Sequence, residues 1–271
     1  MHSIGISLIV SYYKNLTNLS LILKALNQQS TFDFEVLISE DDSNPETETF
    51  LQQHSDTFNF KIQHLNQLVD DGFRKNSMLN KSIQAAKSER LVFIDGDCIP
   101  HKNFIASYLE HIEEGFVFWG RRVMLGEKFS QKLLRDKDVN ILRFVNLLFS
   151  DSKKVKEGIY SPSLRLSNST KGRGLKGCNW GILRKHLLAI NGFDEDYISA
   201  AVGEDSDIEW RLTATGVQLK SMKNKAIVYH VHHPRGYSDT GVQKNIAMME
   251  QRMKENAFVC KNGIEKKESY I

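Results

Sequence analysis

The sequence predicts an α/β fold in which helices flank a mostly parallel central sheet. Up to about residue 125, short β-like runs alternate with helical patterns. Strands that are separated by helices of crossover length usually pair in parallel. The chain of 271 residues, with 41% hydrophobic and 25% charged residues, has ordinary globular composition and can form a sizeable core.

The first half of the chain carries the clearest alternation of strands and helices. Apolar runs predict the strands and helical spacing of apolar residues predicts the helices. Strands are predicted at residues 5–12, 34–40, 59–65 and 90–95, and helices at residues 19–29, 45–54 and 77–87. Ligands of parallel sheets bind outside the carboxyl ends of the strands, so the residues that follow each strand are the first candidates for a site.

The second half begins with a different pattern. Apolar residues near helical spacing predict one helix over residues 128–150. A helix that packs on the core is favoured over one that lies on a membrane, because Asp136, Asp138 and Asp151 dilute the positive charge that anionic lipid attracts. Further on, the sequence predicts a polar, glycine-rich loop at residues 161–177, regular structure at 178–190, a loop at 191–205, a helix at 207–216, a strand at 225–231, and a final polar helix with a charged tail.

The charge, the cysteines and the hydropathy of the sequence argue against several classes of protein. The formal net charge of +3 is spread along the chain without a long Lys/Arg block, which argues against nucleic acid as a partner. Cys98, Cys178 and Cys260 are odd in number and far apart, which argues against a disulfide framework or a structural zinc site. The N-terminus lacks the features of a signal peptide, and no run of about 18 apolar residues occurs. These features predict a cytoplasmic protein without a membrane span.

Polar clusters follow three of the predicted strands. They are Ser11 to Lys14, Glu40 to Ser43, and the sequence Asp95-Gly96-Asp97. Each cluster alone is typical of a turn, because Asp, Asn and Ser side chains bond to the nearby backbone. All three fall on the same edge of the predicted sheet, which favours a shared binding site.

This set of residue types suits a nucleotide diphosphate. A tyrosine ring can stack on a base, and the Asp41 carboxylate can accept the imide N–H of uracil. Asp97 can hold a hard divalent cation that bridges the diphosphate, and Gly96 allows a close approach of the backbone. Arg74 follows the third strand and is a candidate for pairing with phosphate, although spacing alone equally fits an exposed arginine on a loop.

Four acids crowd the start of the predicted helix at residues 207–216. Acidic side chains in a first turn cap a helix and complement its dipole, but one or two would be sufficient for that role. The surplus among Glu204, Asp205, Asp207 and Glu209 can include a general base, because a neighbouring carboxylate raises a carboxyl pKa towards a useful range.

Histidines follow the last predicted strand. His230 and His232 share one face of this strand, so at least one of them is expected to serve packing or hydrogen bonding. A histidine that acts as a metal ligand opposite Asp97 is the alternative.

Seven motifs occur in order along the chain: SLIVSYYKN, FEVLISEDDS, DDGFRKNSMLN, LVFIDGDCIP, GFDEDY, GEDSDIEWRL and VYHVHHP. Taken together, they resemble family 2 glycosyltransferases of the GT-A fold. The branch they resemble is bacterial, has a galactosyltransferase-like C-terminal segment, and includes chondroitin-polymerase-type and surface-polysaccharide enzymes. The resemblance implies a Rossmann-like fold with a small antiparallel element. It also implies a single domain over residues 1–256, with a nucleotide-sugar half (1–125), an acceptor and catalytic-base half (126–256), and a charged tail at 257–271.

The resemblance also assigns roles to the donor-binding residues. It implies that Ser11 and Tyr13 line the nucleotide pocket and that Asp41 reads the uracil. It places Arg74 near the diphosphate or the uracil, and Asp95 near the ribose and the donor sugar. One departure concerns the first acid of the usual DDxS motif, which is Glu40 here and could shift the uracil contact by one residue.

In the family, a carboxylate and a late histidine hold the metal. The resemblance therefore implies that Asp97 is a ligand, with His230 as the second ligand or His233 as the fallback. It makes Asp205 the catalytic base and Glu204 the residue that orients hydroxyl groups. Ser199 to Val202 replace the aromatic and glycine residues that often precede the GED motif, so acceptor recognition is not carried over.

The implied activity is inverting, metal-dependent transfer from a UDP-sugar. The implied cofactor is Mn²⁺ or Mg²⁺, and an imidazole ligand favours manganese. The acceptor would be a glycan or lipid-linked saccharide of bacterial lipopolysaccharide or capsule synthesis, with peripheral membrane contact through residues 128–150 or the tail. Lys171 to Gly177 either close over the donor or form a solvated basic loop.

The alternatives to this function are a catalytically degenerate binding or scaffold domain and a sugar nucleotidyltransferase. A catalytically degenerate binding domain has no physical reason to retain mutually repelling acids. A sugar nucleotidyltransferase requires a glycine-rich phosphate loop after the first strand. The sequence SYYKN, which follows that strand, has no glycine, so this alternative is disfavoured.

Overall fold

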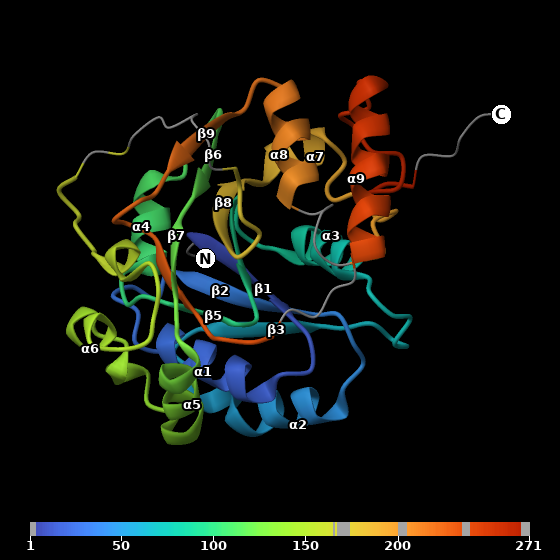
Figure 1. Cartoon of the computed structure of the whole chain (residues 1–271). Coiled ribbons are helices and arrows are strands. Elements are labelled where there is room, and N and C mark those ends of the chain that lie inside the picture. The colour runs from blue at the N-terminus through green and yellow to red at the C-terminus, as the bar shows by residue number, and fades with distance from the viewer. Residues whose placement is uncertain (1–3, 165, 167–173, 200–204, 235–238, 267–271) are drawn as a thin grey trace.

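A seven-stranded sheet forms the centre of the fold (Figure 1). The computed structural model describes residues 4–164, 166, 174–199, 205–234 and 239–266. The strands are, in spatial order, β3 (Lys61–Leu65), β2 (Phe34–Glu40), β1 (Ile6–Tyr12), β4 (Arg90–Asp95), β8 (Asn179–Leu183), β6 (Phe116–Trp119) and β9 (Gln218–Ser221). β1 to β4 run parallel, whereas β8 is antiparallel to both of its neighbours. The predicted mostly parallel sheet is therefore confirmed.

Helices cover both faces of this sheet (Figure 1). Their bounds are α1 Leu16–Leu26, α2 Pro45–His54, α3 Lys75–Ala85, α4 Phe104–His111, α5 Glu127–Asp136, α6 Phe144–Leu148, α7 Arg184–Ala189, α8 Asp205–Ala214 and α9 Asp239–Lys254. Short 3₁₀ turns occur at η1 (Ser55–Thr57), η2 (Val139–Ile141) and η3 (Val155–Gly158).

The central strand β1 contributes to two hydrophobic cores. Leu8 and Val10 belong to the core beneath α1 and α4, whereas Ile9 belongs to the core beneath α3, α7 and α8. Successive side chains of a strand point to opposite faces, so a strand that is covered on both sides is apolar throughout. This is why the first strand contains the uninterrupted apolar run Leu8-Ile9-Val10.

A second, three-stranded sheet stands beside the first. It contains β5 (Cys98–Pro100), β10 (Ile227–His230) and β7 (Arg121–Met124) in the order β5-β10-β7. β10 is antiparallel to β5, and this pairing sets His230 opposite Cys98. The small antiparallel element brings the end of β10 to the turn that follows β4.

The prediction of a single helix over residues 128–150 is wrong, because the structure has α5, η2 and α6 in this segment. α5 ends where Lys137 adopts a left-handed conformation with φ of 48°. The Asp138 carboxylate then accepts a hydrogen bond from the Asn140 backbone N–H at 2.9 Å and starts η2. Short acidic side chains bond to the backbone in this way and compete with helix formation. The apolar spacing continues across the break because Leu133 and Leu147 pack into the same core.

The short strands and α4 lie outside the elements predicted from sequence. β5, β6, β7 and β9 are three or four residues long. Such segments contain too few alternations to distinguish a strand from a loop. Tertiary pairing, rather than local pattern, therefore defines this part of the fold.

The charged C-terminal segment is partly tied to the body of the protein. The Asn191 side chain donates to the backbone carbonyls of Cys260 and Glu265, both at 2.8 Å. Cys260 is buried, as are Cys98 and Cys178, and all three are free thiols. Within the described ranges, no helix combines the length and the apolarity that crossing a bilayer requires.

Candidate active site

A cleft of about 580 Å³ opens at the carboxyl ends of the parallel strands. The register of the sheet explains this location, because β1 pairs Ser11 with Asp95 of β4 and Tyr12 with Glu40 of β2. Most of the predicted site residues meet here. The cleft is lined by Ser11, Tyr12, Tyr13, Asn15, Asn18, Asp41, Gly72, Phe73, Lys75, Asp95, Gly96, Asp97, His233 and Pro234.

The acid pair at the end of β2 divides its two side chains between different partners. Glu40 is fully buried, accepts a hydrogen bond from the Thr47 hydroxyl at 2.7 Å and contacts His64 Nε2 at 2.6 Å. Asp41 lines the cleft and accepts from the Arg74 backbone N–H at 2.9 Å and from Gln67 at 2.7 Å. Burial raises the pKa of Asp41, and these hydrogen bonds oppose the increase. Of this pair, Asp41 rather than Glu40 thus lines the cleft.

Gly96 packs against the end of β1. A Cβ atom at this position would lie 2.9 Å from the Ser11 carbonyl oxygen and 3.2 Å from the Tyr12 Cα. The first distance is shorter than a Cβ atom tolerates against backbone, so glycine allows the turn to approach β1 this closely. Gly96 thereby holds Asp95 and Asp97 at the cleft, on either side of itself.

The cation that lines the cleft is Lys75. Its Nζ atom lies 2.8 Å from Asp95 Oδ1. The guanidinium of Arg74, the residue that the sequence favours, instead contacts Asp71 Oδ2 at 2.8 Å and the Phe73 carbonyl at 3.0 Å. Sequence reasoning misses Lys75, and its position directly after Arg74, at the first residue of α3, is the signal that could have found it.

Asp97 lies between two histidines. Its Oδ2 atom is 3.4 Å from His230 Nε2 and 2.9 Å from His233 Nε2. The hydrogen bond with Asp97 raises the pKa of His233 to about 9, whereas burial lowers the pKa of His230. Burial opposes ionisation of Asp97, but the hydrogen bond with His233 and the charge of His230 keep its pKa below the usual value.

This group fits a divalent metal ion. One ligand atom from each of Asp97, Cys98 and His230 lies within 4.8 Å of the others. The buried Nδ1 atom of His230 has no hydrogen-bond partner among the described residues. An acidic oxygen and an imidazole that is held neutral are the forms that bind a metal. His233 is half exposed and offers a second imidazole at the same carboxylate.

Asp205 is the acid of α8 that reaches the site. It lines a small cavity of about 10 Å³ next to the cleft together with Ser11, Lys75 and Asp95. Its Oδ2 atom accepts from the Gly177 backbone N–H at 3.2 Å, and its Oδ1 atom accepts from the Ser206 N–H at 2.7 Å. The contacts of α8 thus bring the predicted base to a cavity that Asp95 and Lys75 also line.

The other acids of this cluster are used elsewhere. Asp207 is fully buried and pairs with Arg211 at 2.6 Å. Glu209 accepts a hydrogen bond from the Leu175 backbone N–H. Glu204 lies outside the described residues, as do Lys171 to Arg173 of the predicted closing loop.

Comparisons with known proteins identify the family. The family model for glycosyl transferase family 2 matches residues 7–187, and a model described as the N-terminal domain of galactosyltransferase matches residues 164–234. The first match covers well over half of the chain. The chain belongs to glycosyl transferase family 2. It is a glycosyltransferase with the GT-A fold.

Relatives and solved structures of glycosyltransferases agree with this assignment. An alignment of 275 residues with chondroitin synthase from Escherichia coli shows 26% identity. It covers 95% of this chain but only 39% of that protein. Mannosyltransferase PcManGT from Pyrobaculum calidifontis, in complex with GDP-Man and Mn²⁺, matches with a TM-score of 0.62 at 14% identity over 94% of this chain and 67% of its own. The structure of GalNAc-T7 with UDP, GalNAc and Mn²⁺ matches with a TM-score of 0.64 at 14% identity. This match covers 90% of this chain and 47% of the GalNAc-T7 chain.

Proposed function

We propose that this glycosyltransferase moves a sugar, with inversion, from a UDP-sugar to a glycan or lipid-linked saccharide. The setting we propose is bacterial lipopolysaccharide or capsule synthesis. The observation that carries the proposal is the shared cavity of Asp205, Asp95 and Lys75 beside a cleft that also holds Asp41 and Asp97. In this arrangement Asp205 would be the base, Asp95 would lie beside the sugar, and Asp41 would lie beside the nucleotide of a bound donor.

The nucleoside end of the donor would bind between Tyr13 and Asp41. Tyr13 has 56% of its surface exposed and can cover a base, and Asp41 offers carboxylate oxygens to the uracil imide. Ser11 and Asp95 pair across β1 and β4, where the ribose and the donor sugar would follow. The UDP bound to GalNAc-T7 supports the choice of nucleotide, although at 14% identity only the fold is shared.

Asp97 and His230 would hold a divalent cation, with His233 as the alternative imidazole. Such an ion, Mn²⁺ or Mg²⁺, would neutralise charge on the diphosphate as UDP departs. The Mn²⁺ in both solved structures named above supports this part of the proposal. Asp97 would offer an oxygen atom and His230 a neutral nitrogen atom in one place, and His233 would become a ligand only on losing its proton.

Asp205 would act as the general base. In the proposed step, its carboxylate takes the proton of the acceptor hydroxyl while that oxygen bonds to the anomeric carbon. The bond between the anomeric carbon and the phosphate oxygen breaks, and its electron pair leaves with UDP. Glu204 would orient hydroxyl groups nearby. No nucleophile from the protein is needed in a single displacement.

Two cations are candidates for the diphosphate. Lys75 lines the cleft and would reach the diphosphate on breaking its contact with Asp95. Arg74 would need to turn away from Asp71, which is highly exposed and holds it only at the surface. Guanidinium–phosphate pairing is strong enough for such an exchange when a donor is present.

We also propose that the two halves of the chain divide the work. Residues 1–125 contribute the donor site, residues 126–256 contribute the base and the acceptor side, and residues 257–271 form a charged tail. A cytoplasmic location is supported by the three free thiols. Peripheral contact with the inner face of the membrane would bring the enzyme to a lipid-linked acceptor.

A UDP-release assay tests the proposal directly. The full chain is incubated with saccharide acceptors and a panel of UDP-sugars, in Mn²⁺, Mg²⁺ or a chelator. GDP-mannose is the comparison donor, and its turnover is followed as release of GDP. We expect metal-dependent release of UDP from one or a few UDP-sugars, and a product whose anomeric configuration is inverted by NMR. Turnover of GDP-mannose alone, or retention of configuration, would refute the donor or the mechanism respectively.

A further inference from the structure

The short helix α6 exposes an unusual amount of apolar surface. Val145 is 63% exposed, Leu148 is 56% exposed and Phe149, which follows the helix, is 84% exposed. Phe144 is 36% exposed, and Leu147 is the residue of this helix that is buried in the body of the protein. Adjacent large apolar side chains in water mark a surface that is covered in use.

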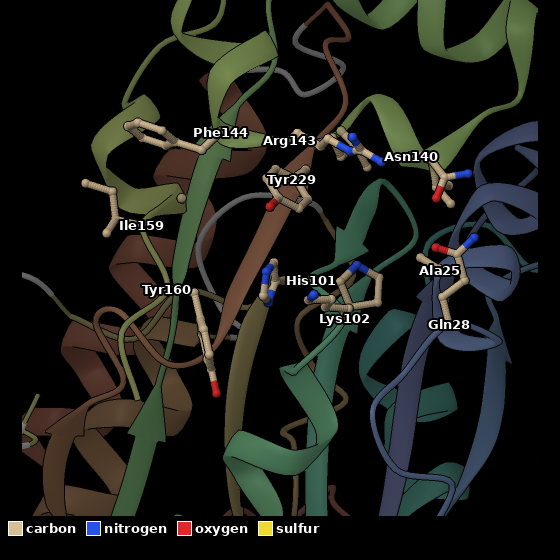
Figure 2. Close-up of a pocket in the computed structure, with 14 residues that line it drawn as sticks. Ala25, Gln28, His101, Lys102, Asn140, Arg143, Phe144, Ile159, Tyr160 and Tyr229 are labelled. Atoms are coloured by element: carbon tan, nitrogen blue, oxygen red, sulfur yellow. The ribbon is translucent and has the colours of Figure 1, made fainter. Parts of the chain in front are cut away.

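A cleft of about 680 Å³ adjoins this helix (Figure 2). It is distinct from the strand-end cleft. Tyr229 lines it, whereas the next residue, His230, lies at Asp97 on the other side of β10. The rings of His101 and Tyr160 stack there at 5.1 Å. The two clefts have no lining residue in common.

The cleft beside α6 has a polar side and an apolar side. Figure 2 shows Phe144 and Ile159 on one side, and Arg143, Asn140 and Lys102 towards the other. Among the described residues, neither Lys102 nor Arg143 makes an ion pair or a side-chain hydrogen bond. Two exposed cations therefore stand beside exposed hydrocarbon, without acidic partners.

A neighbouring cleft of about 710 Å³ extends this cationic surface. It shares Gln28, Val139 and Asn140 with the first and adds Lys24 and Lys137. Asp138 is the one carboxylate among the residues that line the two clefts, and it accepts hydrogen bonds from Asn140 at 2.9 and 2.8 Å. Four cations thus face one acid that is already in use.

The other acids of this segment are also engaged. Asp151 accepts hydrogen bonds from the backbone N–H groups at the start of α5, at 2.8 and 3.2 Å. Asp136 pairs with Lys132 and Arg135 on α5. Asp136, Asp138 and Asp151, which dilute the basic face in the sequence, are therefore engaged by local partners.

We propose that α6 and the two clefts form a docking face for anionic membrane lipid, termed here the α6 face. Phosphate headgroups would bind near Lys102 and Arg143, while Leu148 and Phe149 would enter the acyl boundary. Uncompensated cations beside exposed apolar side chains are complementary to an anionic bilayer surface. The proposed function supplies the purpose, delivery of the enzyme to lipid-linked acceptor, but lipid binding itself does not depend on activity.

Vesicle co-sedimentation of the full chain tests this proposal. The probes are vesicles of phosphatidylcholine alone and vesicles that contain phosphatidylglycerol. We expect binding to the anionic vesicles and weak binding to the neutral ones. Phe149→Ser with Leu148→Ser should weaken vesicle binding by about tenfold or more, because large apolar side chains no longer leave water. Lys102→Gln with Arg143→Gln should weaken binding to anionic vesicles by roughly tenfold.

Matched control variants stand on other surfaces. Leu188→Ser on α7, which is 49% exposed, and Lys81→Gln on α3 should leave vesicle binding unchanged. UDP release from soluble substrates should be unchanged in all of these variants. Loss of vesicle binding with retained UDP release therefore separates this proposal from the proposed function.

Several outcomes would overturn the proposal. They are absence of vesicle binding, equal binding to neutral and anionic vesicles, or equal binding by the wild type and the α6 variants. Inorganic phosphate that binds as tightly as the anionic vesicles, unaffected by Phe149→Ser, would indicate a soluble anion site instead. Self-association that Phe149→Ser abolishes, without lipid binding, would make the α6 face a protein interface.

Discussion

Two acidic clusters that look alike in sequence behave differently in the structure. Asp95 and Asp97 lie at the end of β4 and just after it, and both line the strand-end cleft. Asp205, Asp207 and Glu209 begin α8, and only Asp205 lines a cavity of the site, while Asp207 is buried with Arg211 and Glu209 holds a loop. Residues two apart on a helix point about 200° apart, so Asp207 faces away from Asp205 and pairs with Arg211. Glu209, four residues on, returns to the side of Asp205, and the two acids bond to the backbone N–H groups of Leu175 and Gly177. The turn at the strand end keeps its acids together, whereas the helix divides its acids between two faces.

The largest expected effect concerns the helical cluster. Asp205→Asn should lower kcat for sugar transfer by about a thousandfold, because a carboxamide cannot accept the acceptor proton. Donor affinity, measured by calorimetry with the UDP-sugar, should change little. Glu209→Gln is the matched control on the same helix and should stay within a few-fold of wild type. Similar losses in both variants would erase the distinction between the two acids.

The next prediction concerns the stability of the same cluster. Asp207→Ala leaves the Arg211 charge buried without its partner, which should lower the free energy of unfolding by about 3–5 kcal/mol. The measurement is urea denaturation followed by circular dichroism, with Asp196→Ala as an exposed acid for comparison. If Asp207→Ala proves as stable as the wild type, the buried pair is not the structural element described above.

The strand-end cluster predicts dependence on a metal. Removal of divalent ions by a chelator, or His230→Ala, should lower transfer by at least about a hundredfold, because the charge of departing UDP is no longer balanced. Added Mn²⁺ should restore the chelated wild type. His232→Ala is the control, since its backbone N–H rather than its ring makes the recorded contact with Ser130. Full activity in chelator would show that Asp97 and the histidines serve another role.

A smaller effect separates two neighbouring cations. Lys75→Met should raise the KM for the donor by about tenfold, and Arg74→Met by no more than about threefold, because only Lys75 lines the cleft in this structure. Steady-state UDP release measures both values. The reverse order would mean that Arg74 leaves Asp71 and turns inwards when the donor binds.

The first half of the fold was predictable because its central strands are seven residues long and almost entirely buried. β1 (Ile6–Tyr12) and β2 (Phe34–Glu40) each contain a run of three consecutive apolar residues, which leaves few alternative structures. The break in residues 128–150 was not, because Lys137 and Asp138 interrupt the backbone without interrupting the apolar spacing. The short strands β5, β6, β7 and β9 depend on partners that are distant in sequence.

The site was predictable to the level of strand ends, and less so for individual side chains. Sequence spacing brought Asp41, Asp95 and Asp97 to one cleft. It did not distinguish Lys75 from Arg74. The side chains of two adjacent residues at the start of a helix point in different directions, but the sequence pattern does not show which one faces the cleft. The division of the acids of α8 also required the contacts of Arg211 and Leu175.

A structure of the full chain with UDP and Mn²⁺ tests the central claim most directly. The account predicts uracil between Tyr13 and Asp41, and a metal ion on Asp97 with His230 or His233, in contact with the diphosphate. Asp205 should remain free to receive an acceptor. UDP bound away from the strand-end cleft, for example beside His101 and Tyr160, would contradict the account.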